Sequence, residues 1–402
     1  DADLAAPHRP QLQGRGRGAH GGIHHRRVAL NSRAVTDSRH ALILLLALVL
    51  ALFLLRLGFN GDRDFENAAL GTMTVSCQAK DSNGTPIHTI KQRENEVESM
   101  RKSVAGDSAI FFLGNSQTHS INQKNTGEVV YPELISKSYL NHPVLVNSLP
   151  NANLQEFFTL LNWWNNSISI KKVVIPVFMD DLREDGLRRD FMSGLTRENY
   201  FLPKSDAPLI TDLNGQLQAF LPKEASPKKG SAASATPQDR VEQAINEWLS
   251  ERSQTWRNRP NARGDLFMKL YQLRNQAFGI KATSKRKMIP ARMNRNLQAL
   301  DMLIGFTSEN DIDVLLYIPP IRQDVEVPYD LNEYNTFISD MEQLASNQKH
   351  VHFRNWEDII PARLWGVKAS TNGSDEPELD FMHFQFAGHE ILADSILNAL
   401  SR

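Results

Sequence analysis

Cysteine is nearly absent from this chain of 402 residues, in which Cys77 is the only one. A single cysteine cannot close an internal disulfide, which excludes a small disulfide scaffold and a cysteine-based zinc site. A net charge of −1 gives no overall positive field for binding nucleic acid. The sequence also lacks a glycine-rich phosphate loop, an HExxH zinc motif and an internal repeat, so we expect neither a metal nor a cofactor.

The N-terminal region divides into a polar tail and an apolar run. Residues 1–40 are rich in Gly, Arg and His, with seven arginines against three aspartates, and predict a disordered basic cytoplasmic tail. Residues 41–55 are unbroken apolar sequence that Arg56 can extend by snorkelling, which predicts a transmembrane signal anchor at 41–59. No small-residue cleavage site follows the run. The alternatives are a buried core helix for the run and an RNA-binding role for the tail.

The remaining chain predicts a polar stalk and lead-in at residues 60–106 and one domain at residues 107–402. Apolar strand-like runs at 108–114, 144–146, 172–179, 313–320 and 351–353 alternate with helical patterns at 129–139, 154–164, 294–309, 331–346 and 388–400. This alternation predicts a parallel sheet with right-handed crossovers. Pro176 predicts a bulge or local irregularity in the third strand.

The alternation is interrupted by a predicted helical insertion at about residues 190–300. Within it, residues 241–278 have a helical pattern, and basic residues are frequent between 257 and 295. Such a run is usually a solvated helix face. The alternative is contact with an anionic membrane surface or glycan.

The first strand of the predicted domain ends in Gly114-Asn115-Ser116. Parallel strands deliver ligand and catalytic residues to the carboxyl edge of a sheet, so Ser116 is predicted to be a nucleophile. The alternative is that Ser116 only caps the following helix. A serine nucleophile needs a base and a group that orients the base, and the segment Asp380-Phe381-Met382-His383 supplies both side chains within one turn.

Gly-Asn-Ser after the first strand and Asp-x-x-His before the last helix together resemble the SGNH/GDSL hydrolase superfamily. The resemblance covers about residues 107–185 and 300–402. It implies a flavodoxin-like three-layer α/β/α sandwich, a triad of Ser116, His383 and Asp380, and acyl-ester chemistry. An α/β-hydrolase fold is less compatible, because its Gly-x-Ser-x-Gly motif would require glycine where Thr118 stands.

The sequence departs from this family at the oxyanion hole. The second strand is followed by a turn without glycine, at residues 147–153, and the third by Asp180 and Asp181, although the family has glycine and asparagine there. A carboxylate cannot stabilise an oxyanion unless it is protonated. We therefore expect the Ser116 amide as one donor and name Asn151, Asn153 and Arg183 as candidates for others.

An anchor, an exported domain and a helical insertion together resemble the DltD-like and AlgJ/AlgX-like proteins of bacterial envelopes. The resemblance implies an O-acyltransferase or acyl-esterase that acts on a surface polysaccharide or cell-wall glycan beside a membrane-bound O-acyltransferase. It places the chain in the bacterial inner membrane as a single-pass protein, with the C-terminal domain periplasmic or extracellular. The alternative is a non-catalytic assembly or glycan-binding subunit.

Overall fold

The computed structural model describes residues 73–221 and 269–401, except positions 91, 105, 140, 282 and 372–375, together with six isolated positions. The predicted tail at 1–40, and all but two positions of the predicted anchor at 41–59, lie outside the described residues. Within the described part of the chain, no helix has the length and apolar content needed to cross a bilayer. The two main ranges belong to one of the chain's two compact units, residues 62–241 and 263–402.

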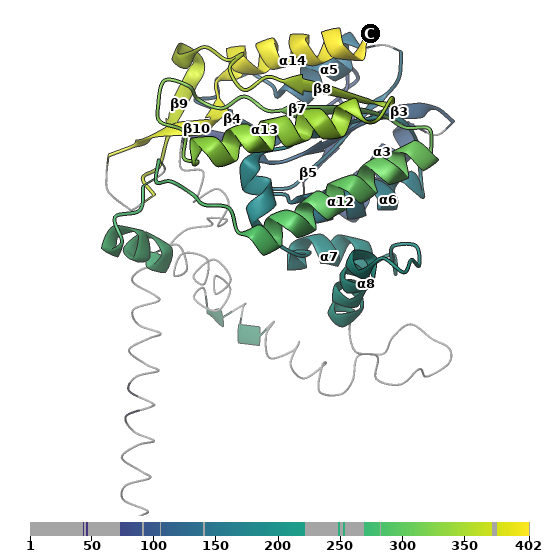
Figure 1. Ribbon diagram of the computed structural model, residues 1–402, viewed down its shortest axis with the longest axis horizontal. Helices are drawn as coiled ribbons and strands as arrows, with labels where there is room; N and C mark the ends of the chain where they lie inside the picture. The colour runs from purple at the N-terminus through teal and green to yellow at the C-terminus, as the bar shows by residue number, and fades with distance from the viewer. Residues whose placement is uncertain are drawn as a thin grey trace, which may run out of the picture. The chain divides into compact units, whose positions relative to one another are not determined.

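A parallel sheet of six strands lies at the centre of this unit, in the order β2-β5-β3-β6-β7-β8 (Figure 1). The strands are β2 (His88–Thr89), β3 (Ser108–Gly114), β5 (Val144–Ser148), β6 (Ser169–Pro176), β7 (Asp313–Ile318) and β8 (Val351–Asn355). Without the short edge strand β2, the order is the 2-1-3-4-5 of flavodoxin-like folds. The predicted α/β fold with a parallel sheet is confirmed.

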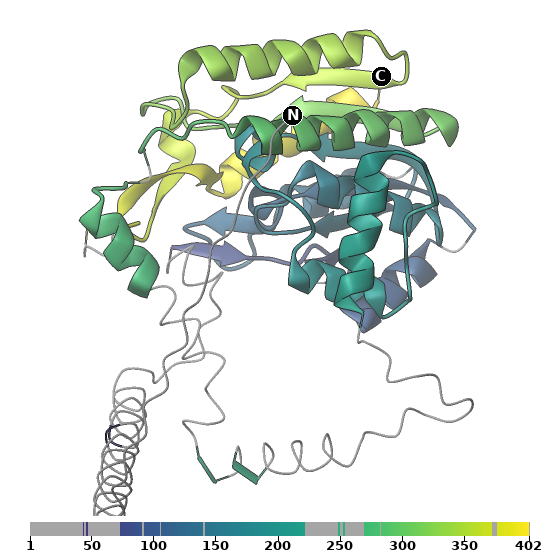
Figure 2. The same cartoon turned by 60° about the horizontal axis from the view of Figure 1, so that its bottom comes forward.

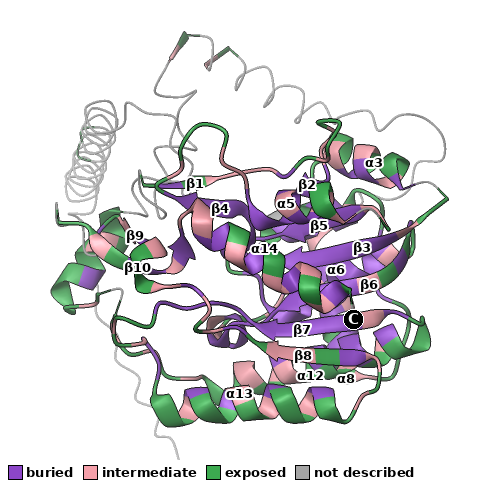
Figure 3. Ribbon diagram, turned by 90° about the horizontal axis from the view of Figure 1, so that it is seen from above, coloured by how far each residue is buried: buried purple, intermediate pink, exposed green. Residues whose placement is uncertain are grey.

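Helices cover both faces of the sheet. α5 (Tyr131–Ser138) and α14 (Phe386–Leu400) pack together on one face, whereas α6 (Leu154–Asn165), α12 (Pro290–Glu309) and α13 (Leu331–Ser346) cover the other (Figure 1). This explains the apolar runs in the central strands: every residue of β3 and β7 after the first is buried, as Figure 3 shows.

Two antiparallel ribbons stand beside the sheet. β1 (Thr74–Ser76) pairs with β4 (Ser120–Asn122), and β9 (Trp365–Lys368) pairs with β10 (Glu378–Phe384). The pairing of β10 shifts register between Leu379 and Phe384. Asn122 joins the ribbons, because its Nδ2 donates to the carbonyl of Val367 at 2.9 Å and to Thr74 Oγ1 at 3.0 Å.

The third strand is regular where irregularity was predicted. β6 remains paired with β7 as far as Pro176, while its pairing with β3 ends at Val174. The amide of Val177 donates to β7, so the position of the missing Pro176 amide faces β3, on the side where the β3–β6 pairing has already ended. The register shift between β3 and β6 lies at the opposite end, between Ala109 and Ile110.

Residues predicted as stalk and lead-in contribute β1, β2 and α3 (Glu94–Ser103), and β2 pairs with β5 of the main sheet. The predicted insertion contains α7 (Arg189–Thr196), α8 (Pro208–Phe220) and a helix at 269–277 (Figure 2). Residues 222–247 and 254–268 lie outside the described residues. The helix predicted at 241–278 is therefore described only in part.

Candidate active site

Ser116 begins α4 (Ser116–His119), directly beyond the carboxyl end of β3. β3 lies between β5 and β6, where the connections turn to opposite faces of the sheet, and ligands of open α/β sheets bind at such a switch point. The N-cap of α4 is Asn115, whose Oδ1 accepts from the Gln117 amide at 3.1 Å. Ser116 is therefore not the capping residue, and its half-buried hydroxyl is left for another contact.

Gly114 permits this tight turn from strand to helix. A Cβ atom at Gly114 would lie 2.6 Å from Thr118 Cβ, which is closer than packed atoms tolerate. Any larger residue at this position would therefore push α4 and Ser116 away from the sheet.

The structure brings Ser116, His383 and Asp380 together. His383 Nε2 lies 3.0 Å from Ser116 Oγ, and His383 Nδ1 lies 2.9 Å from Asp380 Oδ2. An ionised carboxylate only accepts hydrogen bonds, so Nδ1 carries the proton and Nε2 presents its lone pair to the Ser116 hydroxyl. This is the arrangement in which an imidazole can remove the proton of a serine nucleophile.

Besides orienting the imidazole, the Asp380 carboxylate accepts hydrogen bonds from the backbone of its own segment. Its Oδ1 accepts from the amides of Met382 at 2.9 Å and His383 at 3.1 Å, which forms a turn inside the irregular part of β10. The predicted single turn is thus built within a strand. Burial alone would raise the Asp380 pKa, but the charge and hydrogen bond of His383 and the Met382 amide outweigh it and lower the pKa to about 2.

Gln117 connects the two parts of the triad and was not singled out from the sequence. Its Nε2 donates to the carbonyl of Met382 at 2.7 Å and to the carbonyl of Pro320 at 2.8 Å. The residue after the candidate nucleophile is therefore hydrogen-bonded to the residue before the candidate base. Asn122 adds a weaker link, with Nδ2 at 3.4 Å from Asp380 Oδ2.

Three buried polar side chains lie behind α4. The Ala79 amide donates to His88 Nδ1 at 3.3 Å, which leaves the His88 proton on Nε2, 2.7 Å from Ser148 Oγ. Ser148 can then donate to His119 Nδ1 at 2.6 Å. Burial lowers the His88 pKa well below its usual range, which agrees with a neutral ring. This chain of hydrogen bonds joins the end of α4 to the end of β5.

The loop after β5 contains two of the candidate oxyanion donors. Asn153 is the N-cap of α6: its Oδ1 accepts from the Glu156 amide at 3.0 Å, and its Nδ2 donates to the Gly186 carbonyl at 2.9 Å. Asn153 therefore serves the helix rather than an oxyanion. Asn151 is exposed and has φ of 49°, a left-handed conformation that glycine and asparagine adopt most readily.

Arg188 fixes this loop, and its role was also missed in the sequence. It donates to both carboxylate oxygens of the buried Glu156, at 2.8 and 2.6 Å, and to the carbonyl of Pro150. At the start of the loop, the Leu149 amide donates to the Gly114 carbonyl at 2.9 Å. The Pro150 carbonyl, just before Asn151, is thus held by the residue that precedes α7, and the start of the loop is held against the end of β3.

The third candidate, Arg183, is engaged with Asp180 at 3.3 Å and with the carbonyl of Lys287 at 3.2 Å rather than with the triad. Asp180 also pairs with Arg286 and accepts from the Tyr329 hydroxyl at 3.1 Å. Burial raises the pKa of Asp181 well above its usual range, and the charge of Asp180 adds to this. Asp180 is therefore held in ion pairs, and Asp181 Oδ2 accepts from the Phe178 amide at 3.0 Å.

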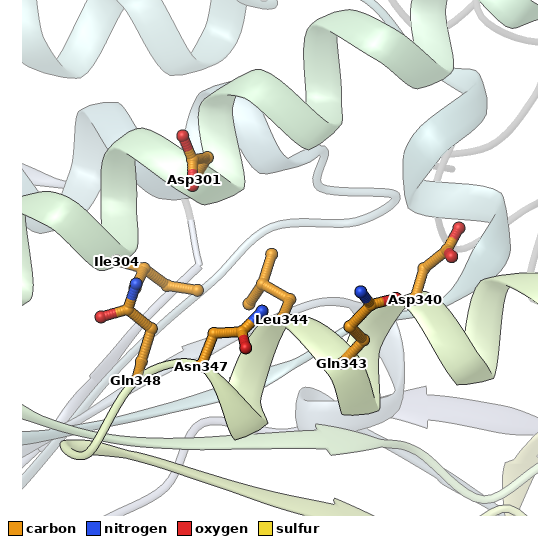
Figure 4. A pocket seen from close by; sticks show the side chains of 7 residues that line it. All are labelled: Asp301, Ile304, Asp340, Gln343, Leu344, Asn347 and Gln348. Atoms are coloured by element: carbon orange, nitrogen blue, oxygen red, sulfur yellow. The ribbon is translucent and has the colours of Figure 1, made fainter.

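Other possible sites are few in the described part of the chain. No group of three or more His, Cys, Asp or Glu side chains among the described residues is placed to hold a metal ion. A cleft of about 280 Å³ between α12 and α13 includes Asp301, Ile304 and Asp340 in its lining (Figure 4). None of its lining residues belongs to the triad.

No family model and no curated protein matches the chain. Among solved structures it is similar to one described as "a putative platelet activating factor from Streptococcus pneumonia". The two are 10% identical with a TM-score of 0.35, over 77% of this chain and 92% of that chain. A TM-score this low does not establish a common fold.

Proposed function

We propose that this protein is a membrane-anchored acyl-transfer enzyme of the SGNH/GDSL type, an O-acyltransferase or acyl-esterase that modifies a cell-surface polysaccharide or cell-wall glycan. The observation that carries the proposal is the contact of His383 with both Ser116 and Asp380, at 3.0 and 2.9 Å. Three residues from two distant segments make the contacts that acyl transfer requires, at the switch point of the sheet.

In the proposed reaction, Ser116 Oγ forms a bond to the acyl carbonyl carbon while its proton passes to His383 Nε2. Asp380 stays ionised, as its low pKa favours, and stabilises the imidazolium. The tetrahedral intermediate then expels the donor's alkoxide, which takes the proton from His383. The product is an acyl ester on Ser116.

In the second half, His383 removes a proton from a sugar hydroxyl or from water, and that oxygen attacks the acyl ester. Collapse of the intermediate returns the proton to Ser116. A sugar acceptor makes the enzyme a transferase, and water makes it an esterase. The amides of Ser116 and Asn151 are the proposed oxyanion donors, because the left-handed Asn151 can take the place of the family's glycine.

The same proposal places the triad domain outside the cytoplasm of a bacterium, anchored in the inner membrane by residues 41–59. A membrane-bound O-acyltransferase is the proposed partner that supplies the acyl group. These parts of the proposal rest on the apolar run and the family resemblance.

The test is to incubate the full chain with an activated acetyl ester and to locate the acetyl group by mass spectrometry. Acetyl on Ser116 is expected, with none at that peptide in Ser116→Ala and an unchanged yield in Ser395→Ala, a half-buried serine on α14. An unlabelled wild type, or equal labelling of Ser116→Ala, would refute the proposal.

A second candidate is a non-catalytic assembly or glycan-binding subunit of an acylation complex. The observation that favours it is the oxyanion site, where Asn153 is used as a helix cap and Asp180 is held in ion pairs. Deleting the gene and restoring it with His383→Ala distinguishes the two. Full glycan acylation with His383→Ala would support the subunit, and loss of acylation with normal protein levels would support the enzyme.

A further inference from the structure

The helix at 269–277 buries one side chain, which is polar, and leaves its two leucines exposed. Asn275 is fully buried, and its Nδ2 donates to the carbonyl of Thr371 at 2.9 Å. Leu270 and Leu273 are 51% and 61% exposed, and Phe278, just after the helix, is 76% exposed. A helix that packs on a soluble domain normally buries the apolar side.

The exposed side chains form one face. Leu270, Leu273 and Ala277 are three, four and seven positions apart, so they lie along the same side of the helix, and all three are exposed. Figures 1 and 2 show this helix at the margin of the unit, next to the β9–β10 ribbon. Contiguous apolar side chains at such a margin indicate an interaction surface.

The sequence around this helix is strongly basic. Residues 266–300 contain eight Lys and Arg and no Asp or Glu. Some of these cations are paired within the domain, such as Lys285 with Glu326 at 3.0 Å. No carboxylate of the described residues pairs with Arg274, Lys281 or Lys287. The Arg274 guanidinium lies 4.7 Å from the centre of the Tyr271 ring and donates to Asn275 Oδ1 at 2.8 and 3.2 Å, so its charge is not neutralised. An apolar helix face flanked by cations is typical of a helix that lies in the interface of an anionic membrane.

We propose that the 269–281 segment docks on a surface of anionic lipid, with Leu270, Leu273 and Phe278 in the acyl boundary and Arg274 and Lys281 at the headgroups.

A second copy of the chain fits this face less well. The exposed apolar face comprises only a few side chains, whereas each partner in a standard interface contributes roughly 20–30 residues. A twofold contact would also place this cationic segment against itself. A sugar polymer fits less well too, because it has no apolar interior to receive two leucines and a phenylalanine.

Docking would also orient the candidate active site. Asn275 bonds to Thr371, and the Thr371 hydroxyl donates to Glu378 at 2.7 Å, at the start of the strand that contains Asp380 and His383. The base side of the triad is thus two hydrogen-bonded contacts away from the docking helix. The proposal does not depend on the acyl-transfer function, because its test measures contact with lipid and not catalysis.

The test uses the full chain with Cys77→Ser and an environment-sensitive label on Ala277→Cys, reconstituted in nanodiscs. The label is expected to be quenched by brominated acyl chains in discs that contain phosphatidylglycerol, and much less in phosphatidylcholine alone. A label on Ala219→Cys, an exposed alanine on α8, is the matched control and should stay unquenched in both. Equal quenching of the two labels, or equal quenching in the two lipids, would overturn the proposal.

Substitutions at exposed positions test the electrostatic and the apolar contributions to docking separately. Lys281→Gln should lower the ratio of docked to undocked helix about fivefold, the effect of one charge near an anionic surface. Leu273→Gln should reduce quenching in both kinds of disc without changing the melting temperature. A label that responded to protein concentration or to an anionic glycan without lipid would assign the face to that partner and refute the lipid proposal.

Discussion

The two sides of the candidate triad are held in different ways. Ser116 follows β3, which is paired with a strand on each edge and buried under helices on both faces. His383 and Asp380 lie on β10, which is paired with β9 and loses its register between Leu379 and Phe384. The nucleophile side is thus fixed by core packing. The base side is fixed by hydrogen bonds that the Asp380 carboxylate accepts and by one that Gln117 donates.

The difference has an energetic meaning. Disturbing β3 means disturbing the core, where deleting one large side chain costs about 3–5 kcal/mol of stability. A single neutral hydrogen bond contributes only about 0.5–1.5 kcal/mol. Single substitutions should therefore be able to move the base side while leaving the fold and the nucleophile side in place.

The largest expected effect comes from removing a reacting group. Ser116→Ala and His383→Ala should each lower kcat for an activated ester by on the order of 10⁶-fold, because neither side acts without the other. Melting temperatures should stay close to that of the wild type. Ester hydrolysis and thermal unfolding measure the two quantities.

The double variant tests whether the two sides act as one unit. If they do, Ser116→Ala combined with His383→Ala should lower kcat no further than either change alone. If the fold decrease in kcat of the double variant were the product of the two single decreases, the two residues would contribute independently.

Asp380→Asn should have the next largest effect, a fall in kcat on the order of 10⁴-fold, because the neutral amide no longer holds the proton on His383 Nδ1. Kinetics on the activated ester measure it. Asp394→Asn, at an exposed position on α14, is the control and should retain full activity. If Asp380→Asn kept the wild-type kcat, Asp380 would not be a member of the triad.

Acid should loosen the contact between the last helix and the nucleophile side. His389 Nδ1 accepts from the Tyr131 amide at 3.3 Å, and its Nε2 donates to the Ser120 carbonyl at 3.2 Å. Burial lowers the pKa of His389 to about 3, so the unfolded chain binds the proton first as the pH falls. The contribution of neutral His389 is complete above about pH 6.5, and about 1.4 kcal/mol is lost per pH unit between about 6.5 and 3.

Denaturant unfolding across this range measures the slope, which His389→Gln should reduce because glutamine does not titrate. His352→Gln, at an exposed position on β8, should leave the slope unchanged. An unaltered slope in His389→Gln would show that other groups dominate the acid response.

The smallest expected effect concerns the link between the sides. Gln117→Leu leaves the Met382 and Pro320 carbonyls without their donor and should lower kcat by up to about 10²-fold, with little change in KM, because a misplaced base affects mainly the transition state. Gln155→Leu is the matched control: a buried glutamine on α6 whose Nε2 donates to Asp185 at 3.0 Å. It should lose stability but keep its kcat. A larger effect on KM than on kcat in Gln117→Leu would argue against positioning.

The sheet was readable from the sequence because strands covered on both faces are continuous apolar runs, as in 108–114 and 313–318. β2 was not, because His88 and Thr89 lie in a polar segment and pair only at the sheet edge. Ser116, Asp380 and His383 were found because each stands in a short local pattern next to a strand or helix end.

The supporting residues could not be found in this way. Gln117 acts on carbonyl groups 203 and 265 positions away, and any buried polar side chain can make such contacts. Asn151 and Asn153 are alike in sequence, and only the backbone shows that one is left-handed and the other a helix cap. The exposure of the leucines at 269–277 could not be predicted either. An amphipathic pattern identifies an apolar face but does not say whether that face contacts the domain.

The separation of Ser116 and His383 by 267 positions also sets an order of events during synthesis. The chain is made from its N-terminus, and all six strands of the main sheet are complete at Asn355, before Asp380 is added. A product that stopped between these two residues would contain every strand of that sheet and the serine, yet neither the proposed base nor its carboxylate. The proposed acyl chemistry would thus begin only after Asp380 and His383 have been added, so a shorter product would hold Ser116 without the groups proposed to activate it.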